Sequence, residues 1–290
     1  MYKLVEIDLD GTLLNSYGEV SEYTKKIIND VQQKGVEIMI ASGRPIDSIK
    51  TIAEEINSTK YFIAGNGAII YDIQKDEVIY EKYIPKSKVI EIAQICQQNN
   101  ISFNIYTEDK IITQDLKYNV LYYYKENLKK DANKITTIMK VDNILEYVKN
   151  DENLKCLKIT VCDENQTIFK SIIRRLRAVE NIDVMDVSHM SRKVFKQGTE
   201  DVNIEYFYTE ISSTQVNKWQ AIKYLLPILQ VNPEEVITIG DNINDKEMIE
   251  YAGLGVCMGQ STPVIKEISD MITDSNNEDG VAKFLKKIYS

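Results

Sequence analysis

The sequence predicts an α/β protein with a doubly wound parallel sheet core of the Rossmann type and an inserted α+β module. Three observations support this fold class. Four short apolar runs each end in small polar or acidic residues, helical segments separate them, and paired short strands dominate the middle of the chain. Because ligands of such sheets bind at the carboxyl ends of the strands, the four polar endings should meet in one crevice.

The four apolar runs have strand length and are rich in β-branched residues. They cover residues 4–7, 36–41, 61–64 and 236–239. Their polar endings are Asp8-Leu9-Asp10-Gly11, Ser42-Gly43-Arg44, Gly65-Asn66-Gly67 and Gly240-Asp241-Asn242. A further unit consists of a strand at 271–274 and a helix from about Asp279.

Helices are predicted between these strands, over residues 21–34, 45–56 and 217–226. Gly35 suits the position just after the first helix, and Pro45 suits the beginning of the second. Asn217 is a candidate N-cap for the third helix, which Pro227 should end or kink.

The middle of the chain reads as a separate module over residues 85–208, so the core should comprise 1–84 and 209–290. The module is predicted to hold helices at 86–98 and 166–180, a tyrosine-rich helical stretch, and strands at 102–107, 110–114, 154–162 and 203–211. Its position between two halves of the core suggests a cap domain.

Composition excludes several classes of protein. The 290 residues are 43% hydrophobic and 27% charged, which is ordinary for a globular protein of about two domains. The net charge of −9 argues against nucleic acid and anionic membranes as partners. A phosphorylated small molecule would need local cations, from a metal ion or from Lys and Arg.

Cysteine usage and hydropathy favour a cytoplasmic protein. The four cysteines have no C-x-x-C spacing and are expected to be reduced and buried. No apolar run reaches 18 residues, and the first ten residues contain three acidic ones, unlike a signal peptide. Monomer and homodimer remain equally open.

Asp8 and Asp10 are the first candidate catalytic residues. Two carboxylates at i and i+2 of an extended segment face the same side. They could share a divalent cation, or divide the work of nucleophile and general acid. Taken alone, two aspartates before Gly11 are more often a turn or a helix cap.

The second acidic group, Asp241 and Asp245 around Asn244, changes this balance. Carboxylate oxygens suit hard cations, and Mg²⁺ commonly takes a few carboxylates with waters and substrate phosphate. Two acidic groups at strand ends of one sheet therefore predict a metal site.

Two further places suit a phosphate group. Ser42 and Gly43 precede a helix and offer a hydroxyl and backbone N–H groups. Lys218 lies in the first turn of a predicted helix, which is unfavourable for a cation unless an anion is bound there. A solvated lysine is the simpler interpretation when Lys218 is taken alone.

Together these motifs resemble the haloacid dehalogenase superfamily, in particular its Cof-type, sugar-phosphatase-like branch (subfamily IIB). The four motifs appear in order as DLDGTLL at Asp8, ASGR at Ser42, Lys218 and GDNINDKEMI at Asp241. NGA at Asn66, AGLGVCMG at Ala252 and NNEDGVA at Asn276 also fit that branch. The resemblance covers the core segments and implies a C2B-type cap.

The resemblance implies a magnesium-dependent phosphatase acting on a small phosphorylated metabolite, either a sugar phosphate or a phosphorylated cofactor. Asp8 would form an aspartyl-phosphate, and Asp10 would protonate the leaving group and then activate water. The implied Mg²⁺ ligands are Asp8, the Asp10 carbonyl and Asp241, supported by Asp245. The implied phosphate-binding residues are Leu9, Ser42, Gly43, Lys218 and Asn244, while Arg44 and Asn66 are possible substrate contacts.

The sequence departs from the family pattern at Trp219, Gln260 and Cys257, and Trp219 is expected to pack on the core or under the cap. His189, the only histidine, is interpreted as structural. Alternatives with the same fold are a non-catalytic metabolite sensor and a phosphotransferase or mutase. A phospho-receiver is disfavoured by the chain's length and by DxDG on the first strand.

Overall fold

The computed structural model describes residues 2–128, 135–185, 191–197 and 200–290. The chain divides into two compact units, residues 1–81 with 216–290 and residues 82–215. The first division lies just after a strand that ends at Glu81, three residues before the predicted 84/85. The second lies seven residues after the predicted 208/209, because one long strand of the second unit continues to Ser213.

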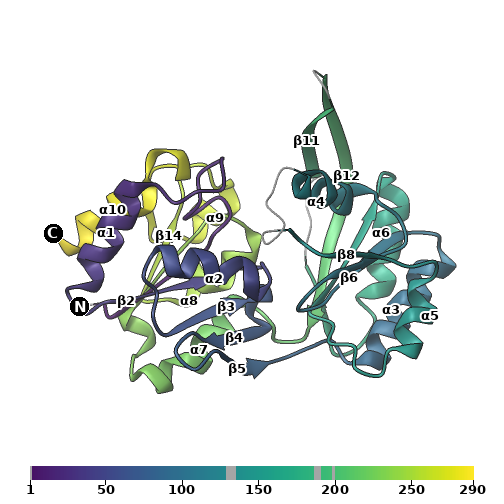
Figure 1. The fold of residues 1–290 in the computed structure, drawn as a ribbon, viewed down its shortest axis with the longest axis horizontal. Coiled ribbons are helices and arrows are strands. Elements are labelled where there is room, and N and C mark those ends of the chain that lie inside the picture. The colour runs from purple at the N-terminus through teal and green to yellow at the C-terminus, as the bar shows by residue number, and fades with distance from the viewer. Residues whose placement is uncertain (1, 129–134, 186–190, 198–199) are drawn as a thin grey trace. The chain divides into compact units, whose positions relative to one another are not determined.

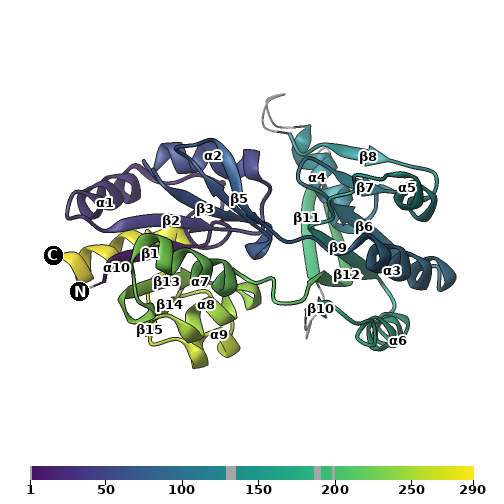
Figure 2. The same ribbon diagram turned by 90° about the horizontal axis from the view of Figure 1, so that it is seen from below.

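The first unit is built on an eight-stranded sheet in the order β15-β14-β13-β1-β2-β3-β4-β5, whose strands are labelled between them in Figure 1 and Figure 2. Its strands are β1 (Leu4–Ile7), β2 (Glu37–Ala41), β3 (Tyr61–Ala64), β4 (Ile69–Asp72), β5 (Glu77–Glu81), β13 (Val236–Gly240), β14 (Leu254–Cys257) and β15 (Met271–Ile272). All neighbours from β15 to β3 pair in parallel, which confirms the predicted fold class.

Helices cover both faces of this sheet. They are α1 (Glu22–Gln32), α2 (Ile46–Glu55), α7 (Lys218–Leu229), α8 (Lys246–Tyr251), α9 (Pro263–Ile268) and α10 (Gly280–Tyr289). Apolar side chains of α7, α8 and α9 pack with those of β1 to β4 in one core cluster, as expected for a helix that buries one stripe. The helices α1 and α10 lie side by side (Figure 2).

The sheet topology brings the predicted polar endings together. β1 lies between β13 and β2, with Leu4 opposite both Val236 and Glu37. Asp8, Ser42 and Asp241 therefore follow the carboxyl ends of three adjacent parallel strands. Short 3-10 turns follow at this edge, η1 (Gly65–Gly67) after β3 and η4 (Ile243–Asp245) after β13.

Three details of the core differ from the sequence prediction. The antiparallel strands β4 and β5 were not predicted, and neither was β14. Of the two outcomes predicted at Pro227, an end of the helix is wrong, because α7 continues to Leu229. A proline in the last turn removes few helical hydrogen bonds, and the left-handed Gln230 (φ 55°) ends the helix instead.

The second unit has a mostly antiparallel sheet in the order β10-β12-β9-β6-β7-β8, with β11 paired to β12. Its strands are β6 (Ser102–Tyr106), β7 (Ile111–Thr113), β8 (Ile138–Lys140), β9 (Lys158–Asp163), β10 (Ile182–Val184), β11 (Ser191–Gln197) and β12 (Glu200–Ser213). Its helices are α3 (Lys86–Gln98), α4 (Tyr118–Asn127), α5 (Ile144–Asn150) and α6 (Gln166–Leu176). Side chains of α3, α5 and α6 form a separate hydrophobic core with this sheet, as expected for an α+β module.

No helix within the described ranges combines the length and the apolar character that a membrane span requires.

Candidate active site

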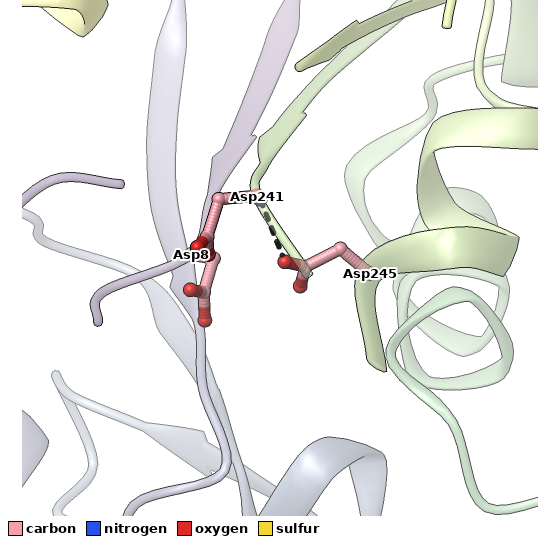
Figure 3. A group of neighbouring side chains, drawn as sticks. All are labelled: Asp8, Asp241 and Asp245. Atoms are coloured by element: carbon pink, nitrogen blue, oxygen red, sulfur yellow. Dashed lines mark hydrogen bonds between the residues drawn. The ribbon is translucent and has the colours of Figure 1, made fainter. Parts of the chain in front are cut away.

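Three carboxylates meet at the carboxyl edge of the core sheet. Asp8 follows β1, Asp241 follows β13, and Asp245 ends η4. One oxygen from each lies within 4.8 Å of the others (Figure 3). These aspartates come from the first and last of the predicted motifs, more than 230 positions apart, and the parallel sheet brings them together as expected.

Two glycines allow this close approach. Gly11 has a φ of +83°, and a Cβ on it would lie 2.5 Å from Oδ2 of Asp241. A Cβ on Gly240 would lie 2.5 Å from Cβ of Asp245. A larger residue at either position would push an aspartate out of the cluster. Close packing against the aspartates therefore explains why these two positions are glycine.

Lys218 completes the cluster from the first position of α7. The side chain of Asn217 accepts a hydrogen bond from the Gln220 N–H and so caps the helix start. Lys218 Nζ donates to Oδ1 of Asp8 and, at 2.6 Å, to Oδ1 of Asp245. The lysine side chain has no exposed surface, so the interpretation of Lys218 as a solvated residue is wrong.

Asp245 acts as the anchor of the cluster. Its Oδ2 accepts the N–H groups of Asp241 at 2.9 Å and Asn242 at 3.0 Å, while Oδ1 accepts from Lys218. Both oxygens are thus engaged in fixing the loop and the lysine. Asp8 and Asp241 are therefore better suited than Asp245 to bind a cation directly.

The electrostatics of the cluster show an excess of negative charge. Burial, and then the charge of Asp245, raise the pKa of Asp8 well above its usual range, although Lys218 opposes the shift. The same two causes raise the pKa of Asp241 to about 7. Burial lowers the pKa of Lys218, but the charges of Asp245 and Asp8 outweigh it and raise that pKa above its usual range.

This excess fits a divalent cation. With all groups ionised, three carboxylates face one ammonium, which leaves two negative charges unbalanced. An all-oxygen donor set is what Mg²⁺ prefers in proteins. The described residues therefore fit the magnesium ion that the sequence predicted.

The predicted phosphate-binding residues lie beside this cluster. Asn66, in a left-handed conformation (φ 57°), donates its N–H to the Ser42 carbonyl at 2.9 Å, and its Oδ1 accepts from Asn244 Nδ2 at 3.1 Å. A Cβ on Gly43 would lie 2.7 Å from that Oδ1. Asn66 thus links the loops that carry Ser42, Gly43 and Asn244, whereas its predicted substrate contact stays a prediction.

Asp10 does not join the other carboxylates. It lies beyond the end of β1, so the same-face argument for two residues of one strand does not apply to it. Its carboxylate pairs instead with Arg44, at 2.6 Å between Oδ1 and Nη2. The proposed contribution of its carbonyl to the metal site stays a prediction.

Leu9, Trp219 and Gln260, which the sequence analysis also singled out, each have a structural role. Leu9 is fully buried, and its carbonyl accepts the N–H groups of Thr12 and Leu14. Trp219 packs in the core cluster, with its ring 6.3 Å from that of Tyr251, so the expected core packing is confirmed. Gln260 donates to the Gly11 carbonyl at 2.5 Å and supports the turn after Asp8.

Glu6 was missed by sequence reasoning. It lies on β1 with no exposed surface, and neither carboxylate oxygen has a hydrogen-bond partner among the described residues. Burial, followed by the charge of Glu37, raises the pKa of Glu6 to about 8. The signal was one acidic residue inside an apolar strand, two positions before Asp8. His189 lies outside the described residues.

Comparison with known proteins identifies relatives over the whole chain. The family profile described as haloacid dehalogenase-like hydrolase matches residues 5–285. Phosphatase YwpJ of Bacillus subtilis is 27% identical over 99% of this chain and 99% of the relative. The 5-amino-6-(5-phospho-D-ribitylamino)uracil phosphatase YcsE of the same organism is 27% identical over 98% of this chain and 94% of the relative.

Solved structures agree in fold. A haloacid dehalogenase-like hydrolase from Bacteroides thetaiotaomicron has a TM-score of 0.77 at 28% identity and covers 100% of both chains. A protein described as a subclass IIB sugar phosphatase has a TM-score of 0.75 at 21% identity, covering 99% of this chain and 98% of the other. That second likeness concerns the fold alone. The superfamily predicted from the motifs is confirmed by the family profile.

Proposed function

The chain belongs to the haloacid dehalogenase-like hydrolases and is a phosphatase of that family, and on this premise we propose that it hydrolyses a small phosphorylated metabolite through an aspartyl-phosphate on Asp8. The observation that carries the proposal is the buried contact of Asp8 with Lys218 inside a cluster of three carboxylates. A sugar phosphate and a phosphorylated cofactor are the two substrate classes considered.

In the first step, an Asp8 oxygen attacks phosphorus while Asp10 gives a proton to the leaving oxygen. In the second step, Asp10 takes a proton from the water that attacks the aspartyl-phosphate, which regenerates Asp8. Lys218, Ser42 and the loop amides of Leu9 and Gly43 hold the phosphoryl oxygens, with Asn244 oriented by Asn66. This assignment agrees with phosphoryl transfer, which depends mainly on positioning and charge neutralisation.

Mg²⁺ is the proposed cofactor. Asp8 and Asp241 would hold it, with the Asp10 carbonyl, and Asp245 would support them through its contacts with the Asp241 loop and Lys218. When bound, the ion supplies positive charge that neutralises the phosphoryl oxygens.

The second unit is proposed to serve as a C2B-type cap that determines which metabolite is accepted. Its insertion between β5 and Lys218 and its separate core support this role. A cytoplasmic location and the absence of nucleic-acid and membrane partners stay predictions from charge and from the four free, buried cysteines. A monomer and a homodimer are the two assembly states considered.

The decisive experiment measures phosphate release from a panel of phosphorylated metabolites, with Mg²⁺ and with EDTA, for the wild type and Asp8→Asn. Turnover that needs Mg²⁺ and disappears in a folded Asp8→Asn protein is the expected result. Turnover that persists in this variant would refute Asp8 as the nucleophile. Metabolite binding without turnover would favour the sensor, and transfer of the phosphoryl group to a second metabolite would favour the mutase.

A further inference from the structure

Arg44 donates two hydrogen bonds to the carboxylate of Asp10. Its Nε donates to Oδ2 at 2.8 Å, and its Nη2 donates to Oδ1 at 2.6 Å. This two-point geometry is specific to a guanidinium, because a lysine ammonium is a single point of charge. The arginine therefore fixes the orientation of the carboxylate as well as compensating its charge.

Arg44 is itself held at three other atoms. Its N–H donates to Ser42 Oγ at 3.2 Å, and its carbonyl accepts the Gly65 N–H at 3.1 Å. Its Nη1 donates to Ser48 Oγ at 3.3 Å. The side chain of Arg44 thus extends from a backbone that is bonded to Ser42 in its own loop and to Gly65 in the turn after β3, and these bonds support its position.

Asp10 needs such a support. Its side chain is 63% exposed, and it follows the last residue of β1 by three positions, so neither the sheet nor burial fixes its rotamer. Asp8, by contrast, is buried and held by Lys218. Proton transfer requires the carboxyl group to stay within hydrogen-bond reach of the reacting oxygen.

We propose that Arg44 is a positioning residue that holds Asp10 where it exchanges a proton with the leaving oxygen and then with water. The inference rests on the proposed function and deepens it. It differs from the expectation that Arg44 contacts the substrate. In the present role the arginine acts through Asp10, and it moves no proton itself.

The test is a double-mutant cycle on kcat/KM, made of the wild type, Arg44→Met, Asp10→Asn and the double variant. The substrates are p-nitrophenyl phosphate and the best alkyl phosphate of the metabolite panel. An alkyl oxygen needs a proton in order to leave, whereas p-nitrophenolate does not. Since kcat/KM covers the steps up to release of the leaving group, it includes the step in which Asp10 gives its proton and excludes the later hydrolysis of the aspartyl-phosphate.

For the alkyl phosphate, Arg44→Met is expected to lower kcat/KM roughly 10- to 100-fold, and p-nitrophenyl phosphate should lose clearly less. In the Asp10→Asn background the same change should have almost no further effect, because the partner is already disabled. Arg44→Lys should restore only part of the loss, since it lacks the second hydrogen bond.

Lys60→Met is the charge-matched control. Lys60 pairs with Glu37 where β3 and β2 begin, at the end of these strands away from the site. The control therefore reports the effect of losing one positive charge. Equal losses on both substrates, or the full loss again in the Asp10→Asn background, would show that Arg44 binds the phosphoryl group directly and would overturn the proposal. An unchanged Arg44→Met enzyme would also overturn it.

Failure of the proposed phosphatase mechanism would give other results than failure of the positioning role. Asp8→Asn with the turnover of the wild type would refute the mechanism as a whole, as would a folded wild type that is inactive on both substrates. Failure of the positioning role alone leaves Asp8 essential while the cycle between Arg44 and Asp10 is additive.

Discussion

Lys218 Nζ lies 2.6 Å from Oδ1 of Asp245, and neither side chain has any exposed surface. The two residues come from different motifs, yet each supplies the charge that the other needs in order to be buried. Lys218 also donates to Asp8, so this one ammonium serves two buried carboxylates. Its removal would leave both without a cation, which is much more unfavourable than the loss of a surface ion pair.

Lys218→Met should therefore lower the free energy of unfolding by about 3–5 kcal/mol and abolish turnover. Urea unfolding in EDTA measures the stability change without interference from bound metal. Lys3→Met is the matched control, because Lys3 pairs with Glu235 while 55% exposed and should matter little. Equal stability losses in the two variants would contradict the buried arrangement.

Mg²⁺ should stabilise the folded protein by mass action. At a tenfold excess over its Kd, the ion should add about 1.4 kcal/mol to the free energy of unfolding, and EDTA should remove this gain. Asp241→Asn should abolish the gain. Asp76→Asn should retain it, because Asp76 lies in the turn between β4 and β5, at the end of the sheet away from the carboxylate cluster. A gain of the same size in Asp241→Asn would place the cation elsewhere.

Gly67→Ala should displace Lys218, although Gly67 has no side chain that could act in the reaction. Gly67 has a φ of +102°, and a Cβ on it would lie 2.2 Å from the carbonyl oxygen of Asn217, the N-cap of α7. The added methyl group must push the start of this helix away, and turnover should fall together with the melting temperature.

Gly18→Ala separates this contact from backbone strain. Gly18 has a φ of +79°, but a Cβ at this position would meet nothing within 4 Å, so its replacement introduces left-handed strain of roughly 1–2 kcal/mol and no collision. We expect Gly18→Ala to lower the melting temperature only and to keep its turnover. Matching losses of turnover in the two variants would refute the steric explanation.

Glu6→Met should stabilise the protein, because it removes a buried carboxyl group without a described partner and keeps an unbranched side chain of similar length. The expected gain at neutral pH is about 1–3 kcal/mol. Denaturant unfolding measures it, with Glu54→Met on the exposed side of α2 as the control. A destabilised Glu6→Met protein would reveal a favourable contact of this carboxyl group.

The pH dependence of this gain follows from the pKa of Glu6, which burial raises to about 8 from the ordinary value of 4.5. The folded state then holds a proton that the unfolded state has lost. The cost of burying Glu6 is therefore smallest below pH 4.5, where the group is protonated in both states, and it grows as pH rises toward 8, so wild-type stability is lost over that range. The difference between Glu6→Met and the wild type should widen over this window, and a constant difference would contradict the shift.

Sequence reasoning found the core because its strands carry local signals. The runs that became β1, β2, β3 and β13 end in polar residues that parallel pairing brings to one end of the sheet, and the motifs at Asp8 and Asp241 specify the family. β4 was missed because it begins only two residues after the Gly-Asn-Gly turn, where the sequence reads as the polar ending of β3. The half-exposed β5 has no clear apolar face.

Side-chain partners were harder to predict than elements. The spacing of Asp8 and Asp10 suggested shared work on one face, but the strand ends at Ile7 and the chain turns at Gly11. The pairing of Asp10 with Arg44 depends on the distance between two strand ends, which no local pattern encodes. The burial of Lys218 likewise depends on two carboxylates from distant segments.

The central place of β1 has a consequence for the order in which the protein can be made. β1 leaves the ribosome before the other strands of its sheet, but Val236, the partner of Leu4 on one side, is synthesised more than 230 residues later. The unit at 82–215 is a single stretch with its own core, so it can finish folding in the meantime. Until β13 emerges, the nascent chain therefore carries an open, apolar strand edge beside its future nucleophile, and translation arrested near residue 215 should yield an aggregation-prone fragment.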